Sequence, residues 1–104
     1  MEGSDDGLKE ATLVSRNPRI VGRELGEGEG TLLLHRTTGA YHRLNRTGGL
    51  VWLALEEPIR FDELVRRVGA ELVKAPVFLT EDLAAYVTDL AGRDLVRLDR
   101  PPSS

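Results

Sequence analysis

The stretch from Tyr41 to Trp52, YHRLNRTGGLVW, constrains the fold more than any other part of the chain. Its first residues complete the strand-like segment Ala40–Leu44, whereas Gly49–Leu55 is an almost continuous apolar run. Between them, Asn45 or Thr47 can accept the first free amide hydrogens of a helix. The chain must therefore turn sharply from a strand into a helix that is largely buried.

Strand patterns cover three segments before this helix: Ile20–Leu25, Thr31–His35 and Ala40–Leu44. The repeated glycines of Gly26–Gly30 permit positive φ at a tight reversal, so the first two strands should form a hairpin. Thr38 and Gly39 mark a second turn. We expect Tyr41 and Leu44 to anchor the third strand in the core. These segments predict a three-stranded antiparallel meander.

Apolar residues recur at helical spacing in two later segments: Phe61, Leu64, Val65, Val68 and Leu72, then Leu83, Tyr86, Val87 and Leu90. Pro58 and Pro76 interrupt the chain before each segment, and Thr80 is a good N-cap for the last helix. We expect helices over residues 61–73 and from Thr80 to Gly92, where a glycine fits the helix end. A short strand at Leu95–Leu98 can follow.

This order predicts an α+β, winged-helix-like fold in which a three-stranded antiparallel sheet is followed by three helices. The 104 residues are enough for one modest core and one domain. We expect a flexible N-terminal segment over residues 1–16, a folded domain over 17–99 and a flexible tail over 100–104, because both ends are polar and the tail contains two prolines.

The side chains offer little for catalysis. The absence of cysteine excludes disulfides, thiolate metal ligands and a cysteine nucleophile, and the serines lie in or beside the expected flexible ends. His35 and His42 are expected on the surface of consecutive strands, and two histidines are too few for a zinc site. A phosphate loop at Gly26–Gly30 is disfavoured, because a strand follows it and two glutamates interrupt it. We expect no enzyme activity, no cofactor and no metal.

The distribution of charge bears on the partners. The net charge is -3, yet Gly30–Leu55 contains three arginines and no acidic residue. The expected third helix carries Glu81, Asp82 and Asp89, which would repel a phosphate backbone. Winged-helix DNA binding therefore stays only an alternative. The chain lacks a secretory signal and an apolar run of about 20 residues, so we expect a cytoplasmic protein without membrane or nucleic-acid partners.

The spacing LLLH-x5-Y-x2-LN-x-TG-x3-W runs from Leu32 to Trp52, and Asp62-Glu63-Leu64 and an apolar repeat from Leu83 to Val96 follow it. Over residues 18–98 the chain resembles the PqqD-like family, the leader-peptide recognition elements of pathways that modify ribosomally synthesised peptides. The resemblance implies a non-catalytic domain that captures the leader of a precursor peptide and presents it to a leader protease or a radical-SAM maturase. A discrete domain of this length is similar to the lasso-peptide pathway type.

In this family the leader adds as a strand beside the third strand, in a groove closed by the third helix. Such binding needs an unpaired strand edge. The resemblance places that edge at Gly39, Ala40, Tyr41, His42, Arg43 and Leu44. The groove wall would be the flank of the third helix that carries Asp82, Tyr86 and Asp89, or the flank that carries Ala84, Thr88 and Ala91. We favour the first flank, although Tyr86 in the core with solvated acids is an equal alternative.

Two residues depart from the family pattern. Arg60 stands where a small capping residue is common, so Asp62 would have to cap the second helix. Asp94 stands where a glycine often precedes the final Leu-Val. Aspartate tolerates left-handed backbone geometry, so the turn before Leu95 should still form.

Overall fold

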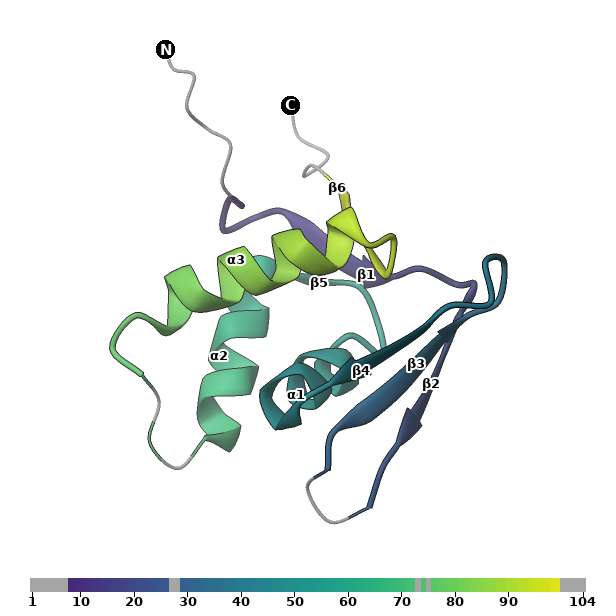
Figure 1. Cartoon of the computed structure of the whole chain (residues 1–104). Helices are drawn as coiled ribbons and strands as arrows, with labels where there is room; N and C mark the ends of the chain where they lie inside the picture. The colour runs from purple at the N-terminus through teal and green to yellow at the C-terminus, as the bar shows by residue number, and fades with distance from the viewer. Residues whose placement is uncertain (1–7, 27–28, 73, 75, 100–104) are drawn as a thin grey trace.

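The computed structural model describes residues 8–26, 29–72, 74 and 76–99, and Figure 1 shows how the elements are arranged. The strands and helices follow in this order: β1 (Leu13–Arg16), β2 (Ile20–Glu24), β3 (Thr31–His35), β4 (Tyr41–Leu44), α1 (Arg46–Ala54), β5 (Ile59–Arg60), α2 (Phe61–Glu71), α3 (Leu79–Gly92) and β6 (Val96–Asp99). The predicted α+β class, with three strands followed by three helices, is confirmed.

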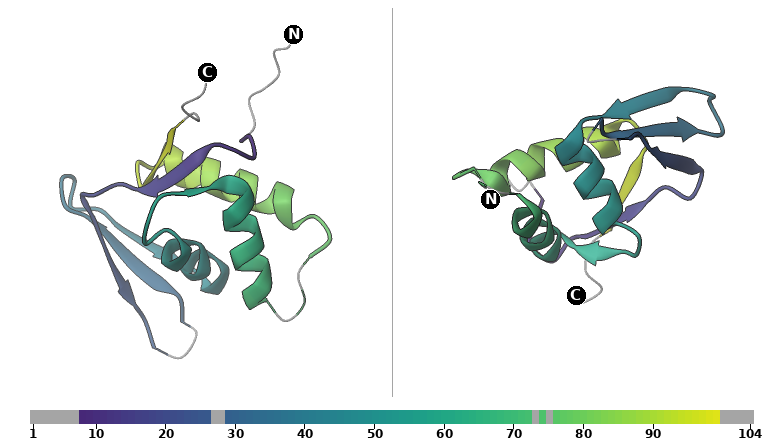
Figure 2. Two further views of the ribbon diagram at one scale, coloured as in Figure 1. Left: turned by 180° about the vertical axis from the view of Figure 1, so that it is seen from behind. Right: turned by 90° about the horizontal axis from the view of Figure 1, so that it is seen from below.

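The strands form two three-stranded sheets rather than one. The predicted meander has the order β2-β3-β4, and a second sheet has the order β5-β1-β6. β1 pairs antiparallel with both of its neighbours, which places Val14 opposite Ile59 and Leu98. Figure 2 shows the meander projecting to one side of the helices.

The predicted domain start at residue 17 is wrong, because β1 is the central strand of the second sheet. Val14 is fully buried, and Leu8 packs against the core as well. The short apolar pattern of Leu13–Arg16 lies within polar sequence, so only its pairing with distant strands makes it a strand. The predicted tail 100–104 and residues 1–7 of the predicted flexible N-terminal segment lie outside the described residues.

The junction between β4 and α1 forms much as its sequence predicts. Asn45 is the N-cap, and its side-chain oxygen accepts a hydrogen bond from the Gly48 amide at 2.8 Å. This cap starts the helix at Arg46, three residues earlier than the apolar run alone indicates. Val51 and Trp52 are then buried, which confirms that α1 packs into the core.

Trp52 also connects the helix to the N-terminal strands. The Arg16 guanidinium lies 4.5 Å from the centroid of the indole ring, and its Nη2 donates to the Trp52 carbonyl at 2.6 Å. Gly22 on β2 faces the same indole, and a Cβ at position 22 would collide with its Nε1. The C-terminal end of α1 is therefore held between β1 and β2.

The two later helices differ from the sequence expectation at their ends. α2 begins after Arg60, which has no side-chain cap bond; Asp62 does not replace it but pairs with the Arg60 guanidinium at 2.9 Å. α3 begins at Leu79 with Phe78 as its N-cap, so Thr80 lies inside the first turn. α3 ends at Gly92 as predicted, and Asp94 has the expected left-handed φ of 64°.

The core lies where α1, α2 and α3 meet the two sheets. Its largest fully buried side chains come from β3, α2, α3 and the segments that follow α1 and precede β6: Leu33, Leu55, Phe61, Leu64, Leu83, Leu90 and Leu95. Within the described residues, no helix is long and apolar enough to cross a membrane.

Candidate functional site

One edge of the meander is open along β4, which pairs only with β3 among the described strands. His35 donates its amide hydrogen to the Ala40 carbonyl at 2.9 Å, and β4 continues in that register, with His42 opposite Leu33. Because the pairing of an antiparallel ladder alternates, the backbone groups of Tyr41 and Arg43 point away from β3. The free edge therefore presents the N–H and C=O groups of these two residues.

The side chains of β4 divide between the two faces of the meander. Leu44 is buried and anchors the strand as predicted. Tyr41 is 66% exposed, so its predicted role as a core anchor is wrong. The reason is register: Tyr41 lies opposite Leu34 on the outer face, one residue out of phase with His42 and Leu44. Gly39 and Ala40 precede the strand in the exposed turn, with Gly39 at φ 78°.

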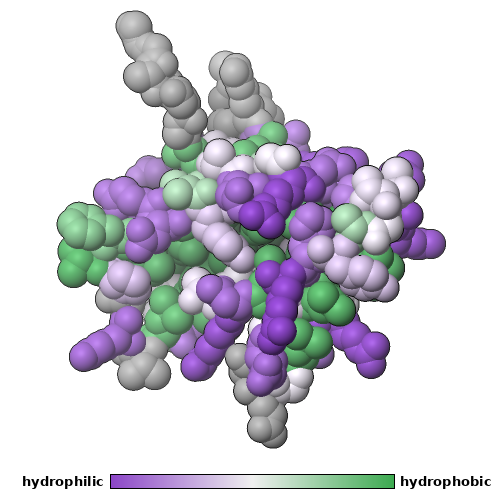
Figure 3. All heavy atoms as spheres, in the orientation of Figure 1, coloured by the Kyte–Doolittle hydropathy of each residue, from purple (hydrophilic) through white to green (hydrophobic). Residues whose placement is uncertain are grey.

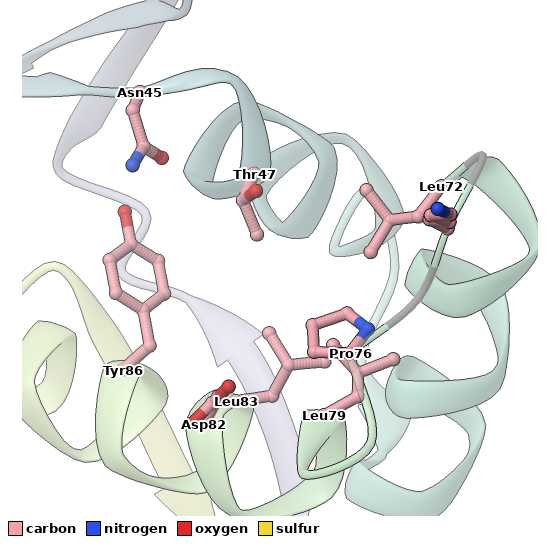
Figure 4. Close-up of a pocket in the computed structure, with 9 residues that line it drawn as sticks. Asn45, Thr47, Leu72, Pro76, Leu79, Asp82, Leu83 and Tyr86 are labelled. Carbon is pink, nitrogen blue, oxygen red and sulfur yellow. The ribbon is translucent and has the colours of Figure 1, made fainter.

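A pocket of about 380 Å³ lies where β4 ends and α1 begins. Figure 4 shows its walls, which come from the start of α1, the segment after α2 and the first turns of α3. The lining residues are Asn45, Thr47, Leu72, Lys74, Pro76, Leu79, Asp82, Leu83 and Tyr86. Apolar walls with a few polar groups are typical of a site that binds a side chain or a small molecule.

Tyr86 forms the boundary between the pocket and the core. Its ring is half-buried, and its hydroxyl points toward Asn45 and lies against Gly48 (Figure 4). A Cβ at position 48 would collide with this hydroxyl, which explains why a glycine suits the TG pair at the start of α1. Burial raises the pKa of Tyr86, and the negative charge of Asp89 adds to the shift while Arg93 opposes it. Tyr86 is therefore a neutral phenol at physiological pH.

The structure brings together only some of the predicted site residues. Asp82 and Tyr86 line the pocket, whereas Asp89 lies outside it and pairs with Arg93 at 3.1 Å. On the opposite flank of α3, Ala84 and Ala91 pack against the core and Thr88 is exposed, and none of the three lines this pocket. Arg43, on the predicted strand edge, pairs with Glu29 at 3.0 Å.

Sequence reasoning did not find the remaining pocket residues as site residues. Asn45 and Thr47 were recognised only as caps, Leu72 was recognised only as part of a helical stripe, and Leu79 was not singled out. Their common location depends on how the α2–α3 connection folds back toward α1. The exposed apolar pair beside them, Val77 and Phe78, gave no periodic signal either; these side chains are 91% and 65% exposed. Figure 3 shows apolar side chains gathered at this end of α3.

The prediction of two surface histidines is wrong for His35. His35 is buried at 4% exposure, and its Nε2 lies 2.9 Å from Oδ2 of Asp94. It points inward because it has the same strand parity as Leu33. Within the described residues, no three His, Asp or Glu side chains come close enough to hold a metal ion.

The fold and the site together define a small domain with an open strand edge beside a pocket. A family model described as coenzyme PQQ synthesis protein D (PqqD) matches residues 30–96, more than half of the chain. The chain therefore belongs to the PqqD family, as its resemblance in sequence predicted.

The fold is also similar to a solved structure described as TbiB1 in complex with the TbiA(beta) leader peptide. The two chains are 28% identical with a TM-score of 0.69, and the match covers 80% of this chain and 94% of that one. No curated protein matches the chain.

Proposed function

We propose that this protein is a non-catalytic adaptor that binds the leader of a ribosomally synthesised precursor peptide by strand addition to β4. The observation that carries the proposal is the open β4 edge next to the pocket at Asn45 and Tyr86. Membership of the PqqD family and similarity to a protein solved with a leader peptide support it.

The two parts of the site would contribute differently to binding. The outward N–H and C=O groups of Tyr41 and Arg43 can bond any extended backbone, so they supply affinity without reading sequence. The pocket supplies selectivity, because burying one apolar side chain is worth about 1.5–3 kcal/mol. Leu72, Leu79 and Leu83 suit an apolar residue, and an aromatic and a proline are what the lasso-pathway type of this family would present.

Strand addition is tested by comparing Arg43→Pro with Arg43→Ala. Proline removes an outward N–H without disturbing the ladder to β3, whereas alanine removes only the side chain. Both variants are titrated with a synthetic leader from the precursor gene beside this one. The alanine variant should lose little leader affinity, because an exposed ion pair is worth about 0–1 kcal/mol. The proline variant should bind at least about tenfold more weakly, a change of about 1.4 kcal/mol.

Equal affinities of these two variants would rule out pairing at β4. Lack of saturable binding by the wild-type protein below about 100 μM would reject that leader as a partner. Measuring affinity at several salt concentrations separates leader binding from the DNA-binding alternative, since binding to nucleic acid weakens steeply as salt rises. Glu81, Asp82 and Asp89 are exposed on α3 and argue against a phosphate-binding surface.

We further propose that the adaptor delivers the leader to a maturation enzyme, a leader protease or a radical-SAM enzyme, in the cytoplasm. The outer face of the meander supports this role. Val21, Leu34 and Tyr41 lie side by side across the three strands, and Arg23, Leu32 and Arg43 form the next row. An apolar row beside two arginines suits an enzyme surface with an apolar centre and a carboxylate rim.

A further inference from the structure

The buried ring of His35 has polar partners at both nitrogens. Nδ1 faces the backbone N–H groups of Thr37 and Thr38 at 3.3 and 3.4 Å. Because these groups can only donate, Nδ1 must accept, which places the proton of the neutral ring on Nε2. Nε2 then donates to Oδ2 of Asp94 at 2.9 Å. His35 therefore organises the β3–β4 turn with one nitrogen and holds Asp94 with the other.

Asp94 is itself fixed to the end of α3. Its amide donates to the Ala91 carbonyl at 3.0 Å, within the turn that closes the helix. Its own carbonyl accepts a hydrogen bond from Nδ2 of the buried Asn17 at 2.8 Å. The left-handed backbone at position 94, with φ 64°, directs the carboxylate toward His35. The carboxylate thus has a defined position relative to α3, although most of its surface is in solvent.

The pair connects the two sides of the candidate groove. Among the described residues, it is the one hydrogen bond or ion pair between the meander and the segment from α3 to β6. His35 is the last residue of β3 and is hydrogen-bonded to Ala40, just before β4, whereas the pocket lies at the other end of β4. In Figure 1 the β3–β4 turn lies on the side of the molecule where α3 ends.

We propose that His35 and Asp94 are positioning residues that set the spacing between the β4 edge and α3 before a peptide binds. This inference rests on the proposed function of that groove. Neither side chain needs to touch the peptide. With the pair intact, the peptide meets a groove of fixed width; without it, binding must also fix the position of the turn, and the affinity falls.

Two substitutions at position 94 separate this role from a charge effect. Asparagine and glycine both tolerate left-handed φ, so neither strains the turn. Asparagine keeps an oxygen that can accept from Nε2, whereas glycine leaves Nε2 without its partner. A labelled synthetic leader from the neighbouring precursor gene should bind Asp94→Asn within about twofold of wild type. Asp94→Gly should bind about three- to tenfold more weakly, the range expected for one lost hydrogen bond.

A second measurement follows the pair without any peptide. Amide hydrogen exchange should accelerate at Thr37, Thr38 and Gly39 in Asp94→Gly but not in Asp94→Asn, because only the glycine variant releases the ring from α3. If Asp94→Gly does not melt cooperatively, His35→Asn replaces it, since its amide can still accept in the turn but is too short to reach Asp94. It should show the same weaker binding.

The outcomes separate this inference from the proposed function. If the wild-type protein binds the leader and Asp94→Gly has the same leader affinity and the same amide hydrogen exchange as wild type, the positioning role is overturned. Peptide binding itself would then still stand. Unchanged affinity with faster exchange would also overturn it, because the turn would then move without affecting the groove. If the wild-type protein binds no leader, both proposals fail. If both variants unfold, the pair is required for the fold and the positioning role is rejected.

Discussion

At the scale of single residues, the site depends on side chains that fill two roles at once. Asn45 caps α1 and lines the pocket, and Tyr86 packs over Gly48 while its hydroxyl borders the same pocket. The cap was predictable, because an Asn before a helical run satisfies a free amide. Its place in a pocket was not, because the opposite wall comes from residues more than 25 positions later.

The ionisation of Tyr86 should report on its burial. Since the folded-state pKa is raised above the unfolded value of about 10, the neutral phenol stabilises the fold fully below pH ~10. That contribution is lost as the pH rises through the folded pKa. The measurement is a pH titration of phenolate absorbance in the wild-type protein and in Tyr86→Phe. The difference between the two curves isolates the signal of Tyr86 from that of Tyr41. We expect a midpoint above 10, and a further rise when a bound leader excludes water; a midpoint at or below 10 would contradict the half-buried position.

At the scale of the elements, the sheet that contains β1 is the main departure from the sequence expectation. β1 is four residues long, and its apolar alternation is too brief to distinguish it from polar coil. It becomes a strand because β5 and β6, far away in the chain, supply partners on both sides. The longer helices α2 and α3 were recognised from their periodicity, and only their end residues differ from those expected.

The importance of β1 is tested by matched valines. Val14 is fully buried at the centre of its sheet, whereas Val21 is 48% exposed on the outer face of the meander. Val14→Ala should lower the free energy of unfolding by about 1–3 kcal/mol, because it leaves a cavity in the core. Val21→Ala should change it by about 0.5 kcal/mol or less. Chemical denaturation measures both, and equal losses would contradict a structural role for β1.

At the scale of the whole molecule, we propose separate roles for the two faces of the meander. The inner face packs on α1, and the outer face carries the apolar row that we assign to the maturation enzyme. A leader strand added at β4 would extend this same outer face. The enzyme could then contact the adaptor and its bound peptide together, which gives a physical basis for delivery.

The outer face is tested with Val21→Glu, since β2 is the strand farthest from the β4 edge. The substitution adds a negative charge to a face that should meet carboxylates, so it should weaken the coupling to the enzyme. Leader affinity should stay within about twofold of wild type. The measurement is leader processing by the protease or maturase encoded beside this gene. Unimpaired processing would place the enzyme contact elsewhere.

The sequence by itself determined the meander, the capped entry into α1 and the left-handed turn at Asp94, because these depend on alternation, turn chemistry and capping within a few residues. It also carried the spacing that identifies the family. Tertiary structure alone decided that β1 is a strand and that His35 is buried against Asp94. It also decided that Asn45, Leu72 and Tyr86 share one pocket. Each of these depends on contacts between residues far apart in the chain, and no local pattern encodes which distant partner is met.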